Sequence, residues 1–255
     1  GLAAGMAHEI NNPLGGIVQS AQNIARRTSL DLPKNRQAAD AIGVDIEKVH
    51  QYMLDRGILE FIESIQSDGA RAAKIVKDML AFSRRSETLV EPASVAEMVD
   101  TVLRLAANDY NLKKHYDFRT VKIVRDLDES LPDVTCDKTK IEQVLLNLVK
   151  NAAQAMSENK EQKDPAITIR TRNESDYARI EVIDNGPGMT DEVRRRVLEP
   201  FFTTKAVGVG TGLGLSVSYF IIAKQHRGTM SVESELGKGT RFVIRLPLNG
   251  SSVPI

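Results

Sequence analysis

The chain lacks the features that would point to an oxidising compartment, a nucleic acid or a membrane. Its 255 residues include one cysteine, Cys136, which excludes an internal disulfide and favours a reducing, cytoplasmic location. Lysine plus arginine (34) and aspartate plus glutamate (34) cancel, so no nucleic-acid partner or contact with an anionic membrane is expected. The longest apolar candidate, "GLGLSVSYFIIA", is shorter than the roughly 18–20 residues of a membrane-spanning helix.

Signal peptide, internal repeat and low-complexity segment are also missing. The chain starts abruptly inside an amphipathic pattern, which indicates a fragment of a longer protein with its sensor domain elsewhere. Whether that longer protein is anchored in a membrane stays open.

Residues 1–85 show helical periodicity, with apolar side chains at alternating steps of four and three. The first run comprises Ala3, Ala7, Ile10, Leu14, Ile17, Ala21 and Ile24. The second comprises Ile58, Ile62, Ile65, Gly69, Ala72, Val76 and Met79. The two runs predict a helical hairpin.

The connection "TSLDLPKNRQAADAIGVD" is polar and contains Pro33 and Gly43, and the stretch near 45–55 can itself be helical. Because one two-helix hairpin buries little by itself, we expect a homodimer whose hairpins form a four-helix bundle. We assign residues 1–90 to this domain.

Residues 91–250 change to a mixed pattern of helices and strands. A helix is expected at about 94–107, then a strand in "RTVKIVRDL" and a helix from about 137 that Asp137 caps. Strands follow in "AITIRTRN", "YARIEVID", "TMSVESEL" and "GTRFVIRLPL", with antiparallel hairpins. The pattern predicts an α+β domain, with 251–255 as a tail.

The stretch "AGMAHEINNPLGG" at 4–16 places a histidine on the solvent side of the first helix. Glu9 is its neighbour, Asn12 lies one turn on, and Pro13 should bend or loosen the helix. A carboxylate beside an imidazole can take its proton and leave the other nitrogen nucleophilic. A zinc site of the H-E-x-x-H type is excluded because the fourth residue after His8 is Asn12. A surface histidine without a role remains an equal alternative on these local features.

Two glycine-rich loops and a helix with paired amides indicate a nucleotide site. "DNGPGM" (184–189) follows an apolar strand and offers Asp184 as a buried acceptor, and "GVGTGLGLS" (208–216) opens a helix, as phosphate-binding loops do. In "NLVKN", Asn147 and Asn151 are four residues apart and can provide amide oxygens to Mg²⁺, while Lys150 can meet a phosphate.

These motifs resemble the catalytic core of bacterial sensor histidine kinases of two-component signalling. The chain carries, in the family's order, "HEINNP", "NLVKNAAQAM", "DNGPGM", "EPFFTTK" and "GTGLGLS", with a closing "GKGTRF". "HEINNPL" and "EPFFTTK" are most similar to the nitrogen-regulation subgroup. The resemblance implies a dimerising helical hairpin followed by an α+β sandwich ATPase domain of the gyrase, chaperone and histidine-kinase type.

By this resemblance, His8 is autophosphorylated from ATP, and the phosphoryl group then passes to an aspartate of a response regulator. Glu9 would assist deprotonation of His8. Asn12 would orient the water that dephosphorylates the regulator, if the protein has that second activity. Whether His8 receives the group from its own chain or from its partner stays open.

The resemblance also implies which residues bind ATP and Mg²⁺. Asn151 would ligate the metal, Asp184 with Thr240 behind it would read the adenine amine, and the stretch from Thr203 to Gly214 would be a lid. Phe201 and Phe202 would anchor that lid by packing, and Lys205 would reach the phosphates. The complete expected set is Asn147, Lys150, Asn151, Asp184, Gly186, Gly188, Met189, Thr203, Thr204, Lys205, Gly210, Thr211, Gly212, Leu213, Gly214 and Thr240.

Three departures from the family pattern stand out. Val209 replaces a common lid cation, His226-Arg227-Gly228 replaces H-G-G and predicts strain at Arg227, and the hairpin connection is long. We expect His50, His115 and His226 to be structural or surface residues.

Two other functions remain possible from the sequence. Gyrase-type and chaperone ATPases use a glutamate where this chain has Asn147, so hydrolysis should be slow here. A nucleotide-sensing scaffold without activity is the other alternative, opposed by the intact motifs. γ-Labelled ATP separates the three: acid-labile label on the protein indicates a histidine kinase, released phosphate an ATPase, and neither a scaffold.

Overall fold

The computed structural model describes residues 2–83, 90–108, 118–158, 164–205 and 210–249, and the side chains of residues 2–8, 74 and 77–83 lie outside this description. The chain divides into two compact units, Gly1–Arg84 with Ala206–Thr211 and Arg85–Lys205 with Gly212–Ile255. Within the described residues, no helix combines the length and the apolar character needed to cross a bilayer.

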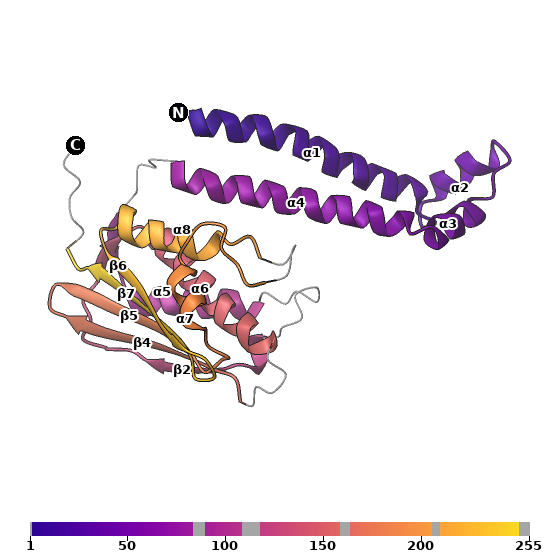
Figure 1. The fold of residues 1–255 in the computed structure, drawn as a ribbon. Coiled ribbons are helices and arrows are strands. Elements are labelled where there is room, and N and C mark those ends of the chain that lie inside the picture. Colours follow the sequence, from indigo (N-terminus) through magenta and orange to yellow (C-terminus); the bar gives the residue numbers. More distant parts are fainter. Residues whose placement is uncertain (1, 84–89, 109–117, 159–163, 206–209, 250–255) are drawn as a thin grey trace. The chain divides into compact units, whose positions relative to one another are not determined.

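The first unit is built around a long helical hairpin. Its helices are α1 (Leu2–Thr28), α2 (Pro33–Asp40), α3 (Ile46–Asp55) and α4 (Ile58–Ser83), and α1 and α4 lie side by side (Figure 1). A side chain at Gly69 of α4 would place its Cβ 2.3 Å from Cγ2 of Val18, so glycine lets the two helices approach closely. The helical hairpin predicted from the two apolar runs is therefore confirmed.

The connection between α1 and α4 is a small helical module rather than an open loop. The Asp45 carboxylate accepts hydrogen bonds from the N–H groups of Glu47 and Lys48 and caps α3, which confirms the helix expected near 45–55. Met53 of α3 packs in a small core with Ala21 of α1 and Ile62 of α4. The α2–α3 module is thus attached to the base of the hairpin.

The second unit is an α+β sandwich, as predicted. Its strands are β1 (Glu91–Ala93), β2 (Lys122–Asp126), β3 (Val134–Cys136), β4 (Ala166–Glu174), β5 (Tyr177–Asp184), β6 (Thr229–Glu235) and β7 (Gly239–Pro247). Its helices are α5 (Val95–Asn108), a 3₁₀ turn at Phe118–Thr120, α6 (Lys138–Glu158), α7 (Asp191–Arg196), α8 (Gly214–Phe220) and a π-helical turn at Ile221–Gln225.

Five strands form the main sheet in the order β2-β4-β5-β7-β6, with β2 and β4 parallel and the other pairs antiparallel. Helices α5, α6 and α8 lie over one face of this sheet (Figure 1). Alternate residues of each strand point into the layer between helices and sheet, where Ile169, Ile180 and Ile244 are buried. The small β1–β3 pair was not predicted.

The opposite face of the sheet carries an ion-pair network around Glu181. This carboxylate lies on the face without helices. It is nevertheless only 1% exposed, because arginine side chains cover it. Arg179 and Arg241 bind its Oε1, and Arg170 lies 3.5 Å from its Oε2. Burial raises the pKa of Glu181, but the hydrogen bonds from Arg241 and Arg179 outweigh it and hold the pKa below its ordinary value.

Candidate active site

The candidate phospho-acceptor motif lies in the first turns of α1. His8 belongs to this helix, but its side chain lies outside the described residues. Glu9 and Asn12 are both exposed, and Pro13 sits inside the helix without ending it. The Glu9 and Asn12 side chains are therefore accessible to a second protein.

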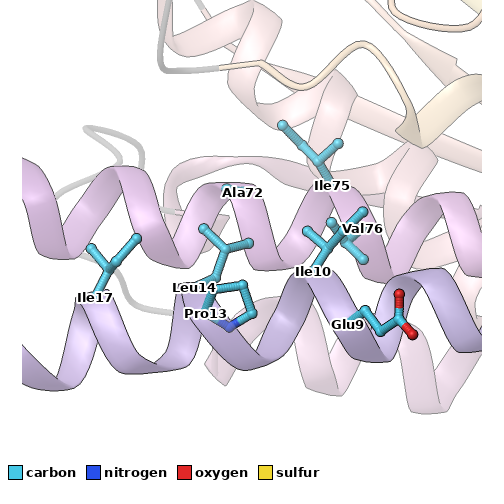
Figure 2. A pocket seen from close by; sticks show the side chains of 8 residues that line it. All are labelled: Glu9, Ile10, Pro13, Leu14, Ile17, Ala72, Ile75 and Val76. Carbon is cyan, nitrogen blue, oxygen red and sulfur yellow. The ribbon is translucent and has the colours of Figure 1, made fainter.

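An apolar groove of about 490 Å³ runs beside this motif between α1 and α4. Figure 2 shows its lining, which consists of Glu9, Ile10, Pro13, Leu14, Ile17, Ala72, Ile75 and Val76. Ile10, Ile17 and Ile24 of α1 are 44%, 51% and 50% exposed and recur every seven residues. Such a stripe is the pattern of a helix face that packs against another helix.

Asp184, at the end of β5, is the best-defined polar group of the second unit. It is 7% exposed, and its Oδ1 accepts the N–H groups of Gly186 (2.9 Å) and Thr240 (3.2 Å). Burial raises its pKa from the ordinary 3.8 to about 6, although both N–H groups act in the opposite direction. Among the described residues none donates a hydrogen bond to Oδ2, which leaves this oxygen for a ligand.

The backbone around Asp184 is packed closely. A Cβ at Gly186 would lie 2.8 Å from Asp184 Oδ1, and at Gly188, where φ is +67°, it would lie 2.0 Å from the Glu235 carbonyl oxygen. Met189 donates its N–H to Ser234 Oγ at 2.9 Å. A cavity of about 340 Å³ borders Asp184, but its lining contains no residue of α6 and includes Arg241 of the face without helices. The lining consists of Ile183, Asp184, Glu233, Ser234, Glu235, Lys238, Gly239, Thr240 and Arg241.

Helix α6 carries the amide pair. Asn147 Nδ2 donates to Ser218 Oγ of α8 at 3.0 Å, and Asn151 Nδ2 lies 3.5 Å from Asn147 Oδ1. The close approach of Asn147 also explains the glycine at position 214, because a Cβ there would lie 2.6 Å from Asn147 Oδ1. Asn147 thus connects α6 to α8. Among the described residues, none donates a hydrogen bond to the Asn151 amide oxygen.

A magnesium ion fits this donor set. Among the described residues, no three His, Cys, Asp or Glu side chains are placed so that they could hold a metal ion together. Mg²⁺ typically keeps several waters and takes one or two protein oxygens plus substrate phosphates. The Asn151 amide oxygen matches such a minimal protein contribution.

A backbone hydrogen bond joins the two sides of the segment from Thr203 to Gly214, which the sequence analysis expected to be a lid. The N–H of Phe201 donates to the Gly212 carbonyl at 3.0 Å, and φ is positive at both residues, +66° and +67°. Thr203 and Thr204 are exposed and Gly210 to Gly212 are half-buried, whereas Val209 lies outside the described residues. Leu213, at the end of the segment, is fully buried.

The two phenylalanines differ from each other. Phe202 is half-buried under the Arg196 guanidinium, 4.4 Å from its ring centre, in line with an anchoring role. The side chain of Phe201 is 59% exposed, so the prediction that it anchors the lid by packing is wrong. Its contribution is the backbone hydrogen bond to Gly212 at a strained φ.

The structure assigns His226 a buried structural role. Its Nε2 accepts the Asp137 N–H at 3.1 Å, which leaves the proton on Nδ1 to donate to the Ile221 carbonyl at 2.8 Å. His226 therefore joins the end of the π-helical turn to the start of α6, while His115 lies outside the described residues. Arg227 has φ +51°, as its place in a glycine position predicts.

Gln154 is a residue that the sequence analysis missed. Lys205 Nζ donates to its Oε1 at 2.7 Å, which brings the expected phosphate ligand of the lid to α6. The one available signal was spacing, since Gln154 lies three residues after Asn151 and shares its helix face. Lys150, on the same helix, is half-buried.

Two known protein families match the chain, one in each unit. Residues 1–88 match the His Kinase A (phospho-acceptor) domain, and residues 136–250 match the histidine kinase-, DNA gyrase B- and HSP90-like ATPase. Sensor kinase CckA of Brucella abortus is 36% identical over 265 residues, which cover 96% of this chain and 24% of CckA. The chain therefore spans about a quarter of that relative's length.

Solved structures show the same fold. Full-length ShkA in complex with AMPPNP has a TM-score of 0.68 at 21% identity and covers 100% of this chain and 47% of ShkA. Histidine kinase ThkA in complex with response regulator protein TrrA has a TM-score of 0.60 at 22% identity and covers 97% of this chain and 62% of that chain. These likenesses show the fold, and the two family matches show that the chain is a histidine kinase catalytic core, with a phospho-acceptor domain followed by an ATPase domain.

Proposed function

We propose that this chain phosphorylates His8 from ATP and passes the phosphoryl group to an aspartate of a response regulator. A ring nitrogen of His8 would attack the γ-phosphorus while the bond to the ADP oxygen breaks, and Glu9 would accept the imidazole proton. The regulator's carboxylate would then take the phosphoryl group and restore the imidazole. The solved complex of ThkA with response regulator protein TrrA supports a partner of this class.

Asp184 is the observation that carries the ATP-binding half of the proposal. Its Oδ1 is fixed by the N–H groups of Gly186 and Thr240, so Oδ2 can accept the adenine amine. The remaining expected contacts, from Lys150, Met189, Thr203 and Thr211 among others, stay proposals on the family motifs. Mg²⁺ bound at Asn151 would neutralise charge on the phosphates.

Asn147 favours phosphoryl transfer over simple hydrolysis. A gyrase-type ATPase needs a carboxylate there to activate water, and an amide has no basic lone pair for that task. The Asn147 amide is moreover engaged with Ser218. Incubation with γ-labelled ATP tests this: acid-labile label on the protein supports the kinase, and released phosphate without label supports the ATPase.

We also propose that the chain acts as a homodimer. The apolar groove and the exposed stripe of Ile10, Ile17 and Ile24 support a four-helix bundle made by two hairpins. Residues 1–90 would form this dimerisation domain, and 91–250 the ATP-binding domain. Sedimentation of the wild type and of an Ile17→Glu variant tests it, since a charge in the stripe should yield monomers.

Finer assignments rest on sequence features. The variants "HEINNPL" and "EPFFTTK" support placement in the nitrogen-regulation subgroup, which transfer assays against a panel of receiver domains would test. The exposed Asn12 supports a phosphatase activity toward the regulator. The buried free thiol of Cys136 supports a cytoplasmic location for this part of the protein.

A further inference from the structure

The contact between Lys205 and Gln154 ties the lid to the helix that carries Asn151. The ammonium donates to the Gln154 amide oxygen at 2.7 Å, and both residues are half-buried. Gln154 is one turn beyond Asn151, so its amide lies next to the place where the metal and phosphates are proposed to bind. The protein itself thus holds the lysine at the phosphate end of the site.

The backbone at Lys205 is held as well. Its N–H donates to Thr203 Oγ1 at 3.2 Å, and the Phe201–Gly212 hydrogen bond joins the two ends of the lid. A Cβ at Gly212 would lie 2.4 Å from the Phe201 carbonyl carbon, so the closure requires glycine. With the backbone held, the contact to Gln154 is a hydrogen bond that directs the flexible lysine side chain toward α6.

We propose that Gln154 is a positioning residue. It holds the Lys205 ammonium near the proposed phosphate site, and when ATP binds the ammonium exchanges its hydrogen bond to Gln154 for one to the phosphates. The proposal rests on the proposed function, because it requires ATP phosphates near Asn151. A neutral amide suits this role, since an anionic phosphate is a stronger acceptor for an ammonium than an amide oxygen is. A carboxylate at position 154 would instead form an ion pair with Lys205 and compete with ATP.

Acetylation kinetics test the contact in the protein without nucleotide. The rate at which Lys205 reacts with an acetylating reagent, followed by mass spectrometry, reports how well its amine is held, and Lys48, whose side chain is 85% exposed, serves as the internal reference. Gln154→Ala should raise the Lys205 rate severalfold and Gln154→Glu should lower it. Gln143→Ala, an exposed glutamine on the same helix, should leave it unchanged. Equal Lys205 rates in wild type, Gln154→Ala and Gln154→Glu would overturn the proposal.

Nucleotide affinity separates positioning from mere stabilisation. Immobilising a long side chain in advance is worth about two- to tenfold in affinity, so Gln154→Ala should weaken ATP binding by that factor and Gln154→Glu by more. Adenosine, which lacks phosphates, should bind all variants equally. Equal losses for ATP and adenosine would indicate a structural role and overturn the proposal. A wild type that binds no ATP would overturn the proposed function itself, whereas ATP binding that is unaltered in both variants overturns the role of Gln154 alone.

Discussion

Asp184→Asn should weaken ATP binding and at the same time stabilise the protein without nucleotide. In the variant, Oδ1 can still accept from Gly186 and Thr240, which places the Nδ2 amine where Oδ2 of the aspartate stands. A donor would then face the adenine amine, which is also a donor. Losing a hydrogen bond to a charged group is worth about 1.5–3 kcal/mol, so the dissociation constant for ATP should rise about 10- to 150-fold.

The stability effect has the opposite sign because the Asp184 pKa is raised on folding. A carboxyl group with a pKa of about 6 in the folded protein and 3.8 ordinarily destabilises the fold progressively as pH rises from about 3.8, and the full loss is reached above about 6. The shift corresponds to about 3 kcal/mol at neutral pH, a loss that the neutral amide of the Asp184→Asn variant would avoid. Urea unfolding at pH 7.5 should therefore show a higher free energy of unfolding for Asp184→Asn than for the wild type.

The pH dependence of ATP binding completes the test. Since the ligand needs the ionised carboxylate, wild-type affinity should fall about tenfold per pH unit below about 6 and stay flat above it. The Asp184→Asn variant should show no such fall, measured by displacement of a fluorescent nucleotide. A variant that binds ATP as tightly as the wild type, or that unfolds more easily, would refute the reasoning about Asp184.

Other predictions concern separate parts of the chain. Asn151→Ala should lose Mg²⁺-dependent phosphoryl transfer, and wild-type rates in an autophosphorylation assay would show that the metal is held elsewhere. Glu9→Gln should slow autophosphorylation by roughly 10²–10⁴-fold, the range typical of a general base. Asn12→Ala should keep autophosphorylation within a few-fold and slow regulator dephosphorylation; if it removes autophosphorylation as well, the division of roles is wrong. Glu181→Gln should lower stability by about 1–3 kcal/mol at pH 7, because it leaves partly buried arginines without their carboxylate. Since the Glu181 pKa is lowered on folding, its contribution is present at neutral pH and lost in acid, so wild type and variant should converge in urea unfolding as the pH falls below the ordinary pKa of a glutamate.

The helices and strands that could be predicted from the sequence are the long ones, in which apolar residues recur with a regular period. The spacing of Leu14, Ala21 and Ile62 predicted the hairpin, and alternation along "YARIEVID" predicted β5. β1 and β3 have three residues each, which is too short for any period to appear. The parallel pairing of β2 with β4 joins segments about forty residues apart, and no local pattern encodes such a pairing.

The candidate site residues likewise divide into those with a local sequence signal and those whose contacts are distant in the sequence. Motifs found Asp184 and the Asn147–Asn151 pair, because each lies in a distinctive sequence context. Gln154 and His226 contact partners 51 and 89 residues away, so these contacts became visible only with the fold. Phe201 was expected, by the resemblance alone, to anchor the lid by packing, but its side chain is 59% exposed and its φ is +66°.

Autophosphorylation of His8 tests the proposed function most directly. Wild-type protein and His8→Ala would be incubated with γ-labelled ATP and Mg²⁺, and the label on the protein measured before and after acid treatment, alongside ATP affinity. We predict acid-labile label on the wild type, none on His8→Ala, and ATP dissociation constants within about twofold of each other, because His8 lies on the helical hairpin and Asp184 in the ATPase domain. A His8→Ala variant that is labelled as fully as the wild type would contradict His8 as the phospho-acceptor.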